Sequence, residues 1–199
     1  MTGLAELAEL DVLEAAGAAF CAQQSERLAE LGIDVASMPV SHLAIRTPTW
    51  TSYLQLRDGL EAHASANLEN VWNGRPISKI LLARPLRLGL RTVDLIELIP
   101  PFHQRVYPMG LEHVAFVVGD GLEEFVERYA DVLTGRQFQT RSFRPAYRMF
   151  DDYTHVKFYA WSLYDACVRE GATFEGFVHA DWHPADADAG PYEIGCADA

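Results

Sequence analysis

The chain has few of the features that mark membrane, secreted and redox proteins. It has no apolar run near the roughly 18 residues of a membrane span, and acidic residues stand early where a secretory signal carries lysine or arginine. Its three cysteines, Cys21, Cys167 and Cys196, are odd in number and share no metal-binding or redox spacing. These absences predict a soluble cytoplasmic protein whose thiols stay reduced.

Basic residues are also scarce, with 16 lysines and arginines against 28 acidic residues and a net charge of -12. The acidity lies at the two ends: residues 1–34 carry -6 and residues 180–199 carry -5, so the middle of the chain is nearly neutral. Such a chain offers no basic face to phosphate groups. We therefore expect neither nucleic acid nor an anionic membrane as a partner.

One short pattern occurs twice in the 199 residues, as Val40-Ser41-His42-Leu43-Ala44-Ile45 and as Leu111-Glu112-His113-Val114-Ala115-Phe116. Each copy is an apolar run with one histidine, followed by a turn signal and a helical pattern. The repeat predicts two copies of one supersecondary unit. Pairing their first strands around a pseudo-twofold axis would bring His42 and His113 together, and two neutral imidazoles facing one cavity are the usual beginning of a metal site.

Each copy has residue patterns that predict the order β-α-β-β-β. In the first copy the predicted elements are a strand at 40–45, a helix that starts after Thr47-Pro48, a hairpin around Asn73-Gly74 and a strand at 92–99. In the second they are a strand at 111–118, a helix after Asp120, short strands near 136–140 and 147–150, and a strand at 154–160.

Three regions follow from these patterns. A leucine stripe over residues 1–34 predicts a helical extension, with Gly17 as a candidate break and Gly32 as its end. Residues 35–175 form the duplicated domain, with modules at about 38–101 and 108–161 and a last helix that starts at Ser162. Residues 176–199 are expected to be an acidic, irregular tail.

Side chains alternate between the two faces of a strand, so the histidines can be assigned to faces. His42 is expected to share its face with Ala44 and Arg46, while Leu43 and Ile45 turn toward a packed helix. His113 is expected to share its face with Leu111, Ala115 and Val117.

Glu97 is out of place in its strand, because it shares a face with Val93, Leu95 and Ile99. Burying an unpaired carboxylate costs several kcal/mol, so a cation, a metal ion or ordered water should compensate it. Two histidines and one glutamate on strands are the ligand types of a facial metal triad with open positions for substrate. The alternative is a buried ion pair of Glu97 with a cation, for which the candidates are Lys157, Lys79 and Arg46.

Several short segments, in order, carry a family resemblance. They are Ser41-His42-Leu43-Ala44-Ile45-Arg46, Asn73-Gly74-Arg75-Pro76-Ile77, Glu97-Leu98, Tyr107-Pro108 with Gly110-Leu111-Glu112-His113, and Val156-Lys157-Phe158 with Trp161-Ser162. This succession resembles the YecM family, a branch of the vicinal oxygen chelate superfamily that includes glyoxalases, bleomycin-resistance proteins and extradiol dioxygenases. The resemblance covers about residues 35–175.

The resemblance implies an α+β fold in which two tandem βαβββ modules form a cupped mixed sheet. It places metal ligands on the first and last strands of each module, at His42, His113 and Glu97. The fourth position is occupied by Lys157, which cannot ligate a metal while it is protonated. His155 lies on the same face two residues away, and it substitutes only if its strand is shifted or bulged.

The resemblance therefore implies one of two functions. The first is a metal-dependent isomerase, lyase or dioxygenase in which a Zn, Fe, Mn, Ni or Co ion binds a small oxygen-rich or carboxylate substrate. In that case Arg46 and Lys157 would hold the substrate, and Lys157 could act as an acid or base. The second is a non-catalytic small-molecule binding or sequestering protein that has no metal. Either would act as a monomer or a homodimer.

Overall fold

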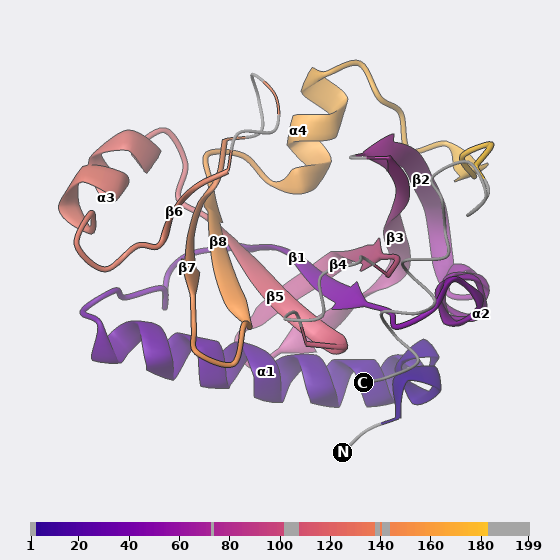
Figure 1. The fold of residues 1–199 in the computed structure, drawn as a ribbon, viewed down its shortest axis with the longest axis horizontal. Helices are drawn as coiled ribbons and strands as arrows, with labels where there is room; N and C mark the ends of the chain where they lie inside the picture. The colour runs from indigo at the N-terminus through magenta and orange to yellow at the C-terminus, as the bar shows by residue number, and fades with distance from the viewer. Residues whose placement is uncertain (1–2, 73, 102–107, 138–139, 141–143, 183–199) are drawn as a thin grey trace.

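A curled mixed sheet, with helices on both of its faces, dominates the computed structural model (Figure 1), which describes residues 3–72, 74–101, 108–137, 140 and 144–182. The first module comprises β1 (Val40–Arg46), α2 (Trp50–Glu61), β2 (Ala64–Trp72), β3 (Arg75–Leu88) and β4 (Arg91–Ile99). The second comprises β5 (Gly110–Val117), α3 (Leu122–Arg128), β6 (Gly135–Arg136), β7 (Ala146–Met149) and β8 (His155–Tyr159). The order expected for each copy is confirmed.

The two modules meet along their first strands. The strand order is β6-β7-β8-β5-β1-β4-β3-β2-β9, and β1 pairs with β5 in antiparallel fashion at the centre. Within each module the first strand pairs in parallel with the last, β1 with β4 and β5 with β8. This is the cupped mixed sheet of two tandem βαβββ units that the sequence predicted.

The outer face of the sheet is covered by α1 (Leu10–Glu30), which runs along its whole width in Figure 1, while η1 (Leu4–Ala8) packs against α1 and α2. The core between the sheet and α1 includes Leu13, Phe20 and Leu28 of the helix. Gly17 does not break the helix. A Cβ at this position would lie 2.8 Å from Leu43 Cδ1, so the glycine lets the helix approach β1 closely.

The helix α1 ends as expected at Gly32, where φ is +78°. On the opposite face of the sheet lies α4 (Leu163–Arg169), whose N-cap Ser162 accepts the N–H of Asp165. Among the described residues, no helix is both long and apolar enough to cross a membrane.

The sequence did not predict β9 (Gly176–Val178), which extends the sheet by pairing in parallel with β2. A strand of three residues has too short a pattern to be recognised without its partner. The remainder of the expected acidic tail, residues 183–199, lies outside the described residues.

Candidate metal centre

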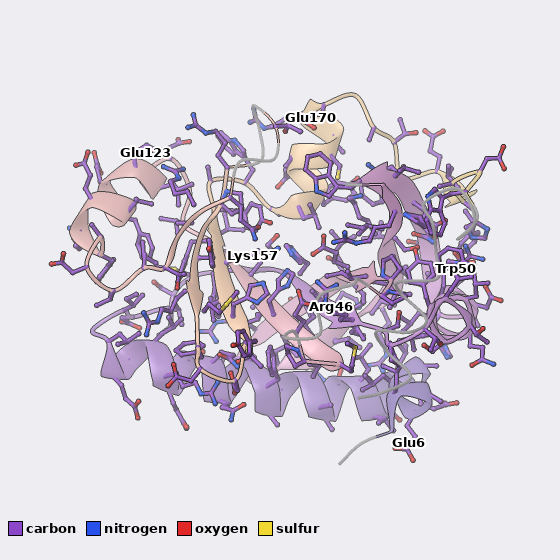
Figure 2. All side chains as sticks on the ribbon, viewed as in Figure 1. Glu6, Arg46, Trp50, Glu123, Lys157 and Glu170 are labelled. Atoms are coloured by element: carbon purple, nitrogen blue, oxygen red, sulfur yellow. The ribbon has the colours of Figure 1, made fainter. Side chains whose placement is uncertain are left out.

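A cavity of about 590 Å³ lies between the sheet and α4. Ionisable side chains from five strands line it: Arg46 of β1, Lys79 of β3, Glu97 of β4, Glu112 of β5 and Lys157 of β8. In Figure 2, Arg46 and Lys157 lie inside the molecule, whereas Glu6 and Glu123 lie at its edges. The cupped sheet therefore collects charged residues far apart in sequence into one interior space.

Two register shifts interrupt the pairing of the two strands that carry His42 and His113. Along β1 and β5 the pairing slips at Ser41 and again at Glu112, the residues that precede His42 and His113. A bulge interrupts strict alternation, so two consecutive side chains can turn to one face. The expected faces were therefore wrong in one respect: Leu111 packs in the outer core, and Glu112 lines the cavity and contacts the His113 ring.

Three donor atoms converge around Glu97, which lines the cavity, and the fully buried His42 and His113. His42 Nε2 lies 3.3 Å from His113 Nε2, and Glu97 Oε2 lies 3.1 Å from His113 Nε2 and 3.6 Å from His42 Nε2. Ligand bonds of about 2.1 Å put neighbouring donors about 3.0 to 3.4 Å apart in octahedral or tetrahedral geometry. Two of the three distances fall in this range and the third, at 3.6 Å, is slightly longer, so the three atoms are close to the spacing of one ion's ligands.

Each histidine is held from behind by the residue that precedes it. His42 Nδ1 lies 2.9 Å from Ser41 Oγ, which also accepts the N–H of Leu163 at 2.7 Å. His113 Nδ1 lies 3.2 Å from Glu112 Oε1. Because a carboxylate only accepts, Nδ1 of His113 carries the proton, and in the neutral ring Nε2 has the free lone pair a metal requires.

The surroundings favour the protonation states of a metal site. Burial lowers the pKa of His42 to about 4, although the nearby Glu97 raises it. Burial would raise the pKa of Glu97, but Lys157 and the two histidines hold it well below its usual range. At neutral pH, His42 is therefore neutral and Glu97 is charged, as metal ligands must be.

Glu112 also fixes Arg46. The Arg46 guanidinium donates to Glu112 Oε2, and both side chains are buried. Burial acts to raise the pKa of Glu112, but Arg46 and His113 hold it far below its usual range. The charged Glu112 carboxylate thus connects the Arg46 guanidinium to the ring of His113, a candidate metal ligand. Sequence reasoning missed it, although a polar residue before each histidine in an apolar run was a visible signal.

His155 lies beside this link rather than among the three converging atoms. It pairs with His113 across β5 and β8, and the two rings stack with their centroids 4.6 Å apart. Its Nε2 lies 3.8 Å from Glu112 Oε1, so Glu112, His113 and His155 form a second group of close potential ligands.

Lys157 occupies the fourth position that the family resemblance implied. Ala44, two residues after His42, pairs with Glu97, and Ala115, two residues after His113, pairs with Lys157. The pseudo-twofold relation of the modules therefore makes Lys157 the counterpart of Glu97. Its side chain lines the same cavity and is 6% exposed.

Burial of the histidines predicts that the metal-free protein loses stability in mild acid. Burial, with His113 and Lys157, lowers the pKa of His155 well below its usual range, as burial does for His42. A group whose pKa falls on folding stabilises the protein above its unfolded pKa, about 6.5 for histidine, and that stability is lost as the pH falls toward the folded value. At pH 5, the shifted pKa of His42 alone should lower the free energy of unfolding by roughly 2 kcal/mol.

We therefore expect the melting temperature of chelator-treated protein to fall between pH 7 and pH 5. His155→Gln should reduce the slope, whereas the exposed His63, changed to Gln, should leave it unchanged. Equal slopes in all three proteins would contradict the assignment of neutral buried rings.

Comparisons with known proteins agree with this architecture. The family model described as YecM protein matches residues 9–159. Protein YecM of Escherichia coli (strain K12) is 24% identical over 155 residues, which cover 70% of this chain and 82% of that protein.

One solved structure supports the likeness in fold, and a second gives a much weaker match. A structural genomics target, protein EC4020, has a TM-score of 0.62 and 21% identity, covering 85% of this chain and 97% of its own. The fosfomycin resistance protein FosX from Listeria monocytogenes, complexed with Mn(II), has a TM-score of 0.26 and 17% identity. That match covers 65% of this chain and 95% of the FosX chain. The family match spans most of the chain and both histidine strands, and the chain belongs to the YecM family.

Proposed function

We propose that this chain is a metal-dependent enzyme that acts on a small oxygen-rich or carboxylate substrate. His42, Glu97 and His113 hold a divalent ion. The observation that carries the proposal is the convergence of three buried donor atoms at 3.1 to 3.6 Å, two of them on rings held at Nδ1. Two nitrogens and one oxygen suit Zn, Fe, Mn, Ni or Co.

A bound ion would supply a Lewis acid that polarises substrate oxygens and stabilises negative charge developing on them. The chain's own residues supply the rest. Lys157, opposite Glu97 in the same cavity, binds an acidic substrate group and is placed to exchange a proton with it. Arg46 lines the cavity and, through Glu112, keeps the His113 ring oriented. His155 flanks His113 and completes the polar wall of the site.

Metal titration of protein made without a histidine tag tests this proposal. After chelator treatment, the unaltered chain should bind one divalent ion and gain thermal stability from it. His113→Ala should weaken binding by at least about 100-fold, because it removes a ligand. The exposed His63, changed to Ala, serves as the matched control and should bind normally.

Glu97→Gln is the second variant, in case His113→Ala is poorly folded. It keeps the shape of the side chain and removes the charge that the ion needs. Metal uptake that is equal in all four proteins, or absent from all of them, would overturn the proposal.

A further inference from the structure

The chain contains only two lysines, and both line the candidate active-site cavity. All the other basic residues are arginines. Lys79 on β3 and Lys157 on β8 are 8% and 6% exposed, respectively. Lysine is among the residues least often buried without a partner, so two buried ammonium groups at one cavity require an explanation.

Neither ammonium group is neutralised by direct contact. In the part of the chain that the structure describes, no carboxylate lies within ion-pair distance of either lysine. Lys79 Nζ donates to the neutral amide oxygen of Asn70 on the neighbouring strand. A buried charge without an ion-pair partner is costly, and an anion in the cavity would remove that cost.

The lysines flank the triad from opposite sides. Cross-strand pairing sets Lys79 beside Glu97, Glu97 beside Ala44, and Ala44 beside His113, in one row across four strands. Lys157 lies beyond β5, where it pairs with Ala115. A ligand held at the triad would therefore have one ammonium group on each side of it.

The charge of the cavity favours an anion with more than one negative charge. Its lining holds four cationic side chains, Arg46, Arg75, Lys79 and Lys157, against the three acidic side chains Glu97, Glu112 and Glu170. A divalent ion at the triad would raise the positive excess from one to three. This positive interior contrasts with the net charge of -12 of the whole chain.

We propose that the ligand of this site is a small diacid, an inference that rests on the proposed function. One acidic group, with a neighbouring oxygen, binds at the triad on the side of Lys157. The second acidic group binds Lys79. Arg75, Ile77 and Lys79 lie at alternate positions of β3, so all three share the face that lines the cavity. Cross-strand partners such as Lys79 and Glu97 have Cβ atoms about 5 Å apart, so a short spacer joins the two groups. The apolar side chains of Leu68, Ile77 and Leu163 line the cavity beside it.

Two probes that differ at one end test the role of Lys79. 2-Oxoglutarate and 2-oxopentanoate share the same chelating head, and a methyl group in the second replaces the distal carboxylate of the first. Zinc-loaded protein should bind 2-oxoglutarate at least about tenfold more tightly in calorimetric titration. Lys79→Met should abolish that preference, and Lys79→Arg should retain most of it. Lys157→Met should weaken the binding of both probes.

Arg87→Met is the matched control, because it removes one positive charge from an exposed side chain outside the cavity. It should leave both affinities unchanged. Equal binding of the two probes by the unaltered protein, or a preference that survives Lys79→Met, would overturn the diacid assignment while leaving the metal proposal intact.

Because the chain has only two lysines, anion binding at Lys79 can be followed by NMR without any metal. Protein labelled with ¹⁵N-lysine has two side-chain signals, and Lys79→Met identifies which belongs to Lys79. Glutarate added to metal-free protein should shift the Lys79 signal, and equimolar butyrate should shift it much less. If no ion binds but this difference appears, the proposed function fails and the anion site stands. If glutarate and butyrate act alike, the anion site fails.

Discussion

Replacing Lys157 with glutamate is expected to tighten the binding of a divalent ion by about 100-fold. The change removes a positive charge beside the ion and puts a carboxylate at the counterpart of Glu97. Without metal, the same variant should be less stable than the unaltered chain, because two carboxylates then face each other in a buried site. Its melting temperature should therefore depend strongly on added metal, as measured by thermal melts with and without chelator.

Lys157→Met is the control that separates charge removal from ligand gain. It should bind the ion somewhat more tightly than the unaltered chain and remain folded. If Lys157 instead serves only as the counter-ion of Glu97, this variant leaves the carboxylate unpaired and should lose about 3–5 kcal/mol of stability. Loss of stability without metal binding in either protein would contradict the metal proposal.

Deletion of residues 1–31 is expected to abolish the soluble, cooperatively folded state. The deletion removes α1 and exposes the outer face of the sheet, against which Leu13, Phe20 and Leu28 are buried. Burial of three large apolar side chains contributes about 5–9 kcal/mol, which is comparable to the whole stability of a domain. Solubility, dye binding and thermal unfolding of the truncated chain measure the effect.

A graded version of this test uses single residues of the same helix. Gly17→Leu should destabilise the protein strongly, because even a Cβ would lie 2.8 Å from Leu43. Ala19→Leu adds a similar side chain on the exposed side of the helix and should change the melting temperature little. A truncated chain as stable as the full one would show that α1 is dispensable.

Most of the fold could be predicted because the same sequence pattern occurs twice in the chain. The repeat around His42 and His113 specified two equal units, and pairing of their first strands then followed from pseudo-symmetry. Glu97 could be assigned to the cavity because an acidic residue is conspicuous on an apolar strand face. The family resemblance put Lys157 at the fourth ligand position, and strand pairing makes it the counterpart of Glu97.

The parts that could not be predicted depend on departures from regular geometry. Alternation along a strand has a period of two and cannot locate a bulge, so the inward turn of Glu112 was missed. The pairing of Arg46 with Glu112 depends on that bulge and was missed with it. Lys79 was considered only as a partner for Glu97, because its confinement with Lys157 in one cavity appears only when the strands are assembled.

The central pairing of β1 with β5 has a consequence for how the protein is made. His42 and His113 are 71 positions apart, and β8, which carries Lys157, is synthesised later still. During translation the first module can pair its own strands, but its histidine and glutamate remain an incomplete set until the second module emerges from the ribosome. The nascent first half therefore lacks part of the proposed metal site, and tight ion capture at that site would be postponed until nearly the whole sheet has been synthesised.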